Sequence, residues 1–238
     1  LVPLMAALRG RCRSLRFRLG LIAGGVHFLS LMYWIVVVLE GYGGLPLLLS
    51  TLVLLALTMY LALYPALFAL LFPWMWRSRL SLLLTAGTWV VLEYARGELL
   101  TGLPWCFIGH SQGPHLLLIQ ICDLAGVYGV SFLVVAVNAL IFAVIFDRGE
   151  GVSRTRALEG GLVLLLLFLA LVYGGYRLQE IEAVVSKGSP LRTAVIQGNV
   201  DQSIKWRPAF QEATVDRYAR LSLRAARFHP ELLVWPET

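Results

Sequence analysis

Charged residues are scarce in this chain. Asp, Glu, Lys and Arg make up only 14% of its 238 residues, against about 25% in a typical soluble domain. Hydrophobic residues make up 58%, which excludes an ordinary soluble domain and indicates a protein that lies mostly within a membrane. The net charge of +6 is compatible with nucleic-acid binding, but the arginines form short clusters between apolar runs, as in cytoplasmic membrane loops. We therefore expect no nucleic-acid partner.

Cysteine and histidine are also few, with three and four residues respectively. The three cysteines are Cys12, Cys106 and Cys122. Cys106 and Cys122 could pair in an oxidising compartment, but their expected role is that of small apolar packing residues. His110 and His115 lack a nearby cysteine or carboxylate that would complete a metal-binding set. The sequence therefore predicts no metal and no cofactor.

Five apolar runs are candidates to cross a bilayer as helices, which takes about 20 residues. They are Leu19–Leu39, Pro46–Phe72, Leu80–Ala95, Leu124–Phe146 and Gly160–Tyr176. Glu93 interrupts the third run, and Arg96 follows three residues later on the same helical face. Charges at membrane depth are costly and tend to be paired, so we expect an ion pair between these two residues that orients the following loop.

The arginines also predict an orientation. They cluster before the first run and in the loops after the second and fourth runs, whereas the alternate loops contain Arg96 as their only basic residue. By the positive-inside rule the arginine-rich loops are cytoplasmic. The sequence therefore predicts the following order of segments: a cytoplasmic basic segment at 1–18, a five-span region at 19–177 with an outer loop at 96–123, a linker at 178–190, and an extracytoplasmic domain at 191–238.

The last segment has the pattern of a soluble α/β domain. Leu191–Ile196 is apolar and rich in β-branched residues, as is Leu232–Trp235, and both are predicted to be strands. Phe210–Phe228 between them is apolar on one face at helical spacing. A strand–helix–strand unit of this length is expected to pair its strands in parallel. One such unit cannot cover both faces of a sheet, so we expect the domain to continue beyond residue 238.

Glu237 follows the second predicted strand directly. In an open α/β sheet, chemistry gathers beyond the carboxyl ends of the strands, so Glu237 is a candidate catalytic acid or base. The alternative is an exposed surface carboxylate. Lys205 and Trp206 lie in the loop after the first strand, where a solvated charge and an interfacial anchor are the alternatives to substrate contact. Pro104 and Trp105 lie in the outer loop, whose glycines, prolines and tryptophan suggest an interfacial segment.

Three stretches together resemble the apolipoprotein N-acyltransferases, bacterial membrane enzymes that carry an extracytoplasmic nitrilase-like (carbon–nitrogen hydrolase) domain. They are residues 89–96 with Thr-Gly-Leu-Pro-Trp at 101–105 and Ser-Gln at 111–112; Val-Ile-Gln-Gly-Asn-Val at 195–200 with Gln202, Lys205 and Trp206; and Leu-Val-Trp-Pro-Glu-Thr at 233–238. The resemblance covers essentially the whole chain. It implies a polytopic α-helical membrane bundle followed by the first βαβ unit of an α/β nitrilase-like domain.

The resemblance also implies an activity. A Glu-Lys-Cys triad takes an acyl chain from a phospholipid as a cysteine thioester and passes it to the N-terminal amine of a diacylglyceryl-modified apolipoprotein. Glu237 matches the triad glutamate, the general base, and Trp206 matches a functional loop tryptophan. Lys205, Trp105 and Pro104 are the other expected substrate-binding residues. The implied location is the bacterial inner membrane, with the nitrilase-like domain on the periplasmic face.

The triad lysine and cysteine of the family lie downstream of these 238 residues, so the chain is expected to be a fragment lacking both ends and inactive alone. Two other functions are compatible with the pattern. A membrane-tethered nitrilase-like amidase would use the same triad with water as the acyl acceptor. A non-enzymatic membrane scaffold or transporter would need none of the triad, although the sequence shows no internal repeat of the kind common in transporters.

Overall fold

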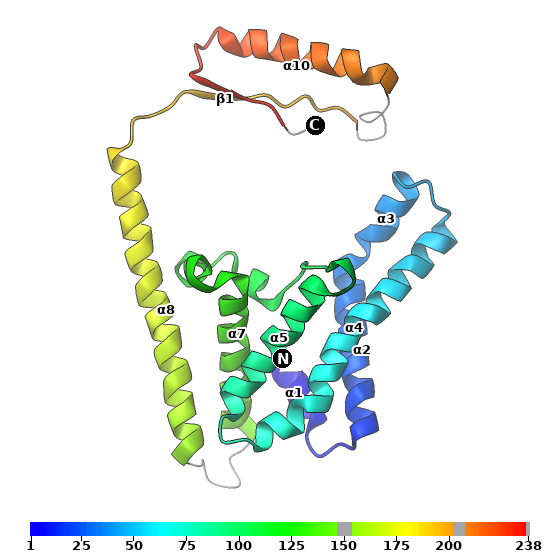
Figure 1. Ribbon diagram of the computed structural model, residues 1–238, viewed down its shortest axis with the longest axis vertical. Helices are drawn as coiled ribbons and strands as arrows, with labels where there is room; N and C mark the ends of the chain where they lie inside the picture. Colours follow the sequence, from blue (N-terminus) through cyan, green and yellow to red (C-terminus); the bar gives the residue numbers. More distant parts are fainter. Residues whose placement is uncertain (147–153, 202–207, 237–238) are drawn as a thin grey trace.

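A computed structural model describes residues 1–146, 154–201 and 208–236. A bundle of helices forms most of the protein, and a small strand–helix–strand unit follows the last long helix (Figure 1). The elements of the bundle are α1 (Val2–Leu8), α2 (Arg13–Met32), α3 (Trp34–Gly41), α4 (Leu47–Arg77), α5 (Ser81–Glu98), η1 (Leu99–Thr101), η2 (Ile108–Gln112), α6 (Leu116–Ile119), α7 (Cys122–Phe146) and α8 (Arg154–Lys187).

Four of the described helices are long and apolar enough to cross a membrane, namely α2, α4, α7 and α8. They confirm that the chain contains a polytopic membrane bundle. The third predicted span is also a helix, α5, but it carries Glu93, Arg96 and Glu98 within its last two turns. Its crossing of the membrane therefore stays a prediction.

Two helix boundaries differ from the apolar runs. The first run does not form one helix, because α2 ends at Met32 and α3 begins at Trp34. In the last run, α8 continues through residues 178–187, which the sequence had suggested as part of a linker. This segment contains six residues that favour helix (two Glu and one each of Leu, Gln, Ala and Lys) and no glycine or proline, and it ends before the sequence Gly188-Ser-Pro190.

Close packing of α2 against α4 depends on two glycines. A Cβ atom built on Gly20 would lie 2.7 Å from the Ala66 Cα, and one built on Gly24 would lie 2.9 Å from the Ala62 Cα. The four-residue spacing puts both glycines on one face of α2, as in the small-xxx-small pattern of membrane helix pairs. Only residues without a side chain let the two backbones approach this closely.

Two apolar clusters hold the remaining helices of the bundle together. The first cluster, which consists mainly of phenylalanine and methionine, joins α1, α4 and α7: Met5, Leu8, Phe68, Ala69, Phe72, Met75 and Phe142. Smaller side chains join α5, α7 and α8: Leu82, Ala86, Val135, Ala136, Ala139, Ala143 and Val163. The two clusters fix α5 and α7, which carry the two ends of the outer loop.

The strand–helix–strand prediction is confirmed. The structure has β1 (Thr193–Val195), η3 (Pro208–Phe210), α10 (Gln211–Ala226) and β2 (Leu232–Val234). β1 and β2 pair in parallel, with Ala194 opposite Leu233. Beyond β2, the Trp235 ring stacks on Tyr218 of α10 at 5.4 Å between centroids, and its indole N–H donates to the Ser222 hydroxyl at 2.9 Å. Helix α10 is thereby fixed against the end of the second strand.

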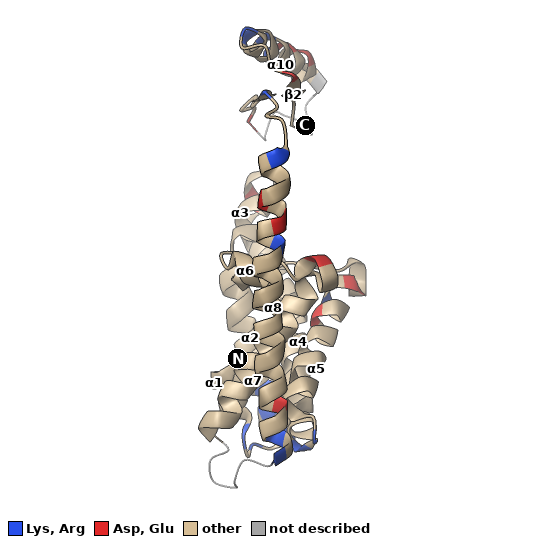
Figure 2. Ribbon diagram, turned by 90° about the vertical axis from the view of Figure 1, so that its left-hand side faces the viewer, with Lys and Arg blue, Asp and Glu red and all other residues tan. Residues whose placement is uncertain are grey.

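Charge is distributed unevenly along the bundle. Figure 2 shows a cluster of Lys and Arg at the end opposite the strand–helix–strand unit, whereas the other end carries most of the acidic residues together with the basic residues of upper α8. The arginine-rich segments that the sequence placed on one side of the membrane therefore lie at one end of the bundle.

Candidate functional site

The outer loop between α5 and α7 has an unusual backbone. Leu100, Thr101 and Gly102 are consecutive residues with positive φ values of 53°, 71° and 73°, and Cys106 follows with 57°. A Cβ atom on Gly102 would lie 1.8 Å from the Gly97 carbonyl oxygen, so only glycine fits there. Non-glycine residues hold such angles only where the surroundings impose them, which is common at functional sites.

Arg96 is the side chain that imposes this path. It is only 2% exposed and reaches from the last turns of α5 into the loop. Its guanidinium donates to the Trp105 carbonyl oxygen at 2.7 Å and lies 3.5 Å from the carbonyl oxygens of Leu103 and Cys106. The same group lies 5.1 Å from the ring centre of Phe28 and 4.8 Å from that of Phe107. The planar guanidinium can serve several acceptors and two rings at once.

Glu93 holds the loop one turn earlier on the same face of α5. One carboxylate oxygen, Oε1, accepts a hydrogen bond from the Ile108 backbone N–H at 2.7 Å, while Oε2 is buried without a partner. The ion pair that we expected between Glu93 and Arg96 is not among the ion pairs of the described residues. Instead, the two side chains bind the loop backbone separately, on either side of Phe107. They still orient the loop, but through its carbonyl and N–H groups.

Trp105 and Pro104, two predicted substrate-binding residues, lie in the segment that Arg96 holds. The Trp105 ring is 48% exposed and lies against Trp34, the first residue of α3, at 5.0 Å between ring centres. Sequence reasoning did not single out Trp34. A tryptophan near the end of an apolar run is a known signal for the membrane interface, and it could have drawn attention to this residue.

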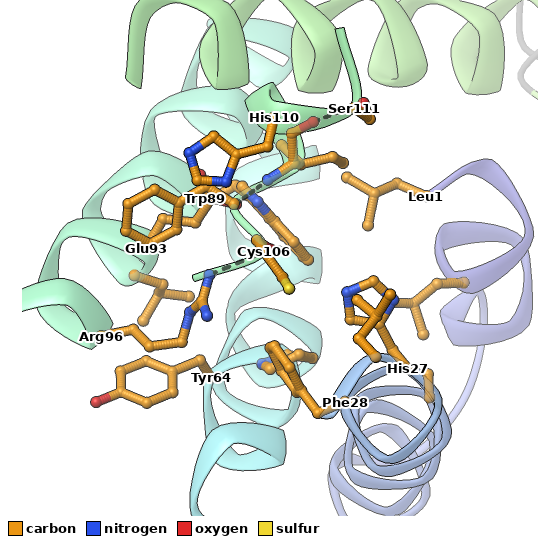
Figure 3. Close-up of a pocket in the computed structure, with 18 of the residues that line it drawn as sticks. Leu1, His27, Phe28, Tyr64, Trp89, Glu93, Arg96, Cys106, His110 and Ser111 are labelled. Carbon is orange, nitrogen blue, oxygen red and sulfur yellow. Dashed lines mark hydrogen bonds between the residues drawn. The ribbon is translucent and has the colours of Figure 1, made fainter. Parts of the chain in front are cut away.

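A cavity of about 670 Å³ lies beneath the loop (Figure 3). Its lining comes from α1, α2, α4, α5 and residues 106–111 of the loop, and most of it is apolar. Figure 3 shows the polar side chains that border it, among them His27, Glu93, Arg96, His110 and Ser111. Binding sites for small molecules commonly combine an apolar wall with a few polar groups in this way. The cavity is therefore suited to an apolar chain that ends in a hydrogen-bonding group.

One motif of the loop was missed by the sequence analysis. Gly109-His-Ser-Gln-Gly113 has the spacing of a nucleophile elbow, the turn that exposes a catalytic serine between a strand and a helix. The structure places Gly109–Gln112 in the short 3-10 helix η2, and no described strand precedes that helix in the chain. The Ser111 hydroxyl donates to the Ile108 carbonyl oxygen at 2.7 Å and accepts from the Gln112 amide at 2.9 Å. Ser111 thus caps a turn of the loop, and its hydroxyl has no hydrogen bond to a basic side chain within the described residues.

The other predicted site residues, Glu237, Lys205 and Trp206, lie outside the described residues. Within the described parts of the chain, no three His, Cys, Asp or Glu side chains are grouped to hold a metal ion. Cys12, Cys106 and Cys122 are free thiols, so Cys106 and Cys122 are not bonded to each other.

Comparison with known proteins identifies similar sequences. The family model described as "Apolipoprotein N-acyltransferase N-terminal domain" matches residues 1–140. The chain is 43% identical over 238 residues to the apolipoprotein N-acyltransferase of Geobacter metallireducens. This alignment covers 99% of the chain and 45% of that protein. It is 37% identical over 242 residues to the enzyme of the same name from Azotobacter vinelandii, covering 99% of the chain and 43% of that protein.

The apolipoprotein N-acyltransferase of Shewanella oneidensis is 34% identical over 230 residues, covering 94% of the chain and 40% of that protein. The chain thus spans a little less than half the length of the curated relatives it matches.

Proposed function

Because the chain belongs to the apolipoprotein N-acyltransferase family, we propose that it is part of an enzyme that moves an acyl chain from a phospholipid to a lipoprotein. The acceptor in this proposal is the N-terminal amine of a diacylglyceryl-modified cysteine. The observation that carries the proposal is the family match over residues 1–140, with relatives of that name aligned over nearly all of the chain. The apolar helices and the mostly apolar lining of the cavity support it.

The proposed chemistry has two steps. A cysteine thiolate attacks the ester carbonyl carbon of the phospholipid, so that a thioester forms and the lysophospholipid alkoxide leaves. The acceptor amine then attacks the thioester carbonyl, an amide forms and the cysteine sulfur leaves, while the general base takes the proton that the amine loses and passes it to the sulfur. Glu237 is the proposed general base that takes the proton from the thiol and returns it to the leaving oxygen. A lysine supplies positive charge for the tetrahedral oxyanion. In this proposal the lysine and cysteine come from the longer enzyme of which this chain is a part.

Trp206, Lys205, Trp105 and Pro104 are the proposed substrate-binding residues. Trp105 has an exposed ring on a loop that Arg96 and Glu93 hold in place, which suits contact with an acyl chain. Both substrates are anchored in lipid, so a site at the membrane surface brings them together at high effective concentration.

The proposed location is the bacterial inner membrane, with the outer loop and the strand–helix–strand unit on the periplasmic face. The arginine-rich end of the bundle would then face the cytoplasm, as the positive-inside rule requires.

Product analysis tests the proposed function. The full-length enzyme is reconstituted in vesicles that contain a phospholipid with one radiolabelled acyl chain and a synthetic diacylglyceryl lipopeptide. We expect the label on the α-amine of the lipopeptide, through an amide bond. Release of the label only as free fatty acid would instead indicate a hydrolase that uses water as the acceptor. Retention of all label in the phospholipid would contradict both enzymatic readings.

A further inference from the structure

We propose that Trp34 and Trp105 form a binding contact for the ester region of a glycerolipid substrate. This inference rests on the proposed function, because it names the part of the lipid that the outer loop contacts. Trp105 was expected to bind substrate, whereas Trp34 is a new member of the site. The phospholipid donor and the diacylglyceryl acceptor share the chemistry that the two rings would recognise, namely fatty-acyl esters of a glycerol backbone.

The geometry of the pair supports a binding surface. The two indole rings lie 5.0 Å apart between centres and are tilted by 33°, so they are in direct contact. They come from different elements, since Trp34 begins α3 and Trp105 lies between η1 and η2. Trp105 is 48% exposed, although its backbone carbonyl accepts a hydrogen bond from the buried Arg96 guanidinium. A residue whose backbone is fixed and whose side chain is left open is well prepared to bind a ligand.

The polar edges of the rings indicate what the ligand offers. Within the described residues, neither indole N–H takes part in a hydrogen bond, whereas the indole N–H of Trp235 does. An indole N–H is a donor only, so a ligand group that bonds to it must be an acceptor. Ester carbonyl oxygens are acceptors that lie at the boundary between headgroup and acyl chain. Tryptophan favours this boundary because its ring is apolar and its N–H is polar.

The surroundings of the pair are apolar and exposed. Tyr33 is 66% exposed and Val37 is 62% exposed on the α3 side, and Leu100 is 80% exposed on the loop side. Within α3, Glu40 is the one charged residue, and it is acidic. A helix of this composition suits the neutral ester and the first methylene groups of an acyl chain better than a phosphate.

Substitution of Trp34 tests the contact, with Trp74 as a matched control. Trp74 is 68% exposed on α4, near Arg77 at the opposite end of the bundle, so it shares the interfacial setting but not the proposed site. In the full-length enzyme, we expect Trp34→Ala to raise the KM for the donor or for the acceptor about tenfold and to change kcat less than about twofold. This pattern is expected when the lost contact binds the ground state and the transition state equally. Trp34→Phe keeps a ring but loses the N–H, so we expect an increase of about threefold. Trp74→Ala should change neither KM.

The substrate whose KM rises identifies the lipid that the pair contacts, and either result supports the proposal. Equal changes in Trp34→Ala and Trp74→Ala would contradict it, because they would show general interfacial anchoring. Unchanged KM values in Trp34→Ala, with a lowered melting temperature, would contradict it as well.

A binding measurement separates failure of this inference from failure of the proposed function. Phosphatidylethanolamine with a nitroxide-labelled acyl chain, and a diacylglyceryl lipopeptide with the same label, are titrated onto the detergent-solubilised full-length protein. We expect weaker binding of at least one lipid to Trp34→Ala than to Trp74→Ala, whether or not the protein shows acyl transfer. Identical affinities of both variants for both lipids would overturn the proposed contact and leave the acyltransferase proposal intact.

Discussion

Arg96 carries a charge in an otherwise apolar part of the bundle, where an unpaired cation would be costly. The structure offsets this cost with carbonyl oxygens of the loop and with the faces of Phe28 and Phe107. The Glu93 carboxylate is buried as well, and the hydrogen bond from the Ile108 N–H offsets part of its desolvation cost. Because their hydrogen-bond partners are backbone groups of one loop, the two buried side chains fix the loop, and no ion pair between them is among those of the described residues.

Loss of the guanidinium should therefore open the loop. A hydrogen bond to a charged group contributes about 1.5–3 kcal/mol, and about 1.4 kcal/mol corresponds to a factor of ten in an equilibrium constant. We expect Arg96→Gln to raise the rate of maleimide modification of Cys106 at least about tenfold, in protein whose Cys12 and Cys122 are replaced by serine. Arg96→Lys should show a similar increase, since an ammonium cannot reproduce the planar fork.

The control is Arg79→Gln, which removes an exposed arginine just before α5, at the opposite end of that helix from Arg96. It should leave the modification rate of Cys106 unchanged. A rate in Arg96→Gln equal to that of the unsubstituted protein would show that the loop does not depend on this clamp.

Sequence reasoning found part of this site. The spacing of Glu93 and Arg96 on one helical face predicted that they orient the loop, and Pro104 and Trp105 were chosen from the loop itself. Their backbone partners could not be predicted, because those contacts depend on a run of positive φ angles set by tertiary packing. The Trp34–Trp105 contact joins residues far apart in sequence, and a single sequence gives no signal for such a pair.

The pairing of α2 with α4 is an interaction between elements that two glycines make possible. In a membrane, helices gain little from apolar burial alone, so close backbone packing becomes important. Gly24 is the more informative position, because a Cβ atom there would meet Ala62 of α4 within 3 Å, whereas one on the neighbouring Gly25 would meet nothing within 4 Å.

This contrast makes a matched pair of variants. We expect Gly24→Leu to destabilise the protein by about 1–3 kcal/mol or more, the usual cost of overpacking a close contact. Gly25→Leu should be close to neutral, since leucine also favours helix over glycine. The measurement is the thermal unfolding of both variants in the same detergent. A lower melting temperature for Gly25→Leu than for Gly24→Leu would contradict the observed packing of these helices.

Most elements could be predicted from apolar runs, because a run of about 20 apolar residues has few alternatives to a spanning helix. The predicted strand–helix–strand order and the parallel pairing of β1 and β2 were also correct. Helix ends were less predictable. Apolar character ends at Tyr176, but α8 continues to Lys187 because helix-forming residues follow and no glycine or proline interrupts them.

At the scale of the whole molecule, the distribution of arginines predicts one orientation in the membrane. The loop that carries His110 and the loop that carries Arg79 should lie on opposite sides. We expect a cysteine introduced by His110→Cys or by Ser203→Cys, in a cysteine-free protein, to react with a membrane-impermeant maleimide in intact spheroplasts. A cysteine introduced by Arg79→Cys should react only after lysis. Labelling of the first two positions only after lysis would reverse the proposed orientation.

The central claim is that this chain supplies the general base of an acyltransferase, and acyl-enzyme formation tests it most directly. The measurement is covalent labelling by a phospholipid with a radiolabelled acyl chain, in the full-length enzyme, in its Glu237→Gln variant and in the 238-residue chain alone. Glutamine keeps the shape of the side chain but cannot accept the proton, so we predict a rate lower by about 10²–10⁴-fold. The chain alone should take up no label. Labelling of Glu237→Gln at the rate of the unsubstituted enzyme, or any labelling of the chain alone, would contradict the account.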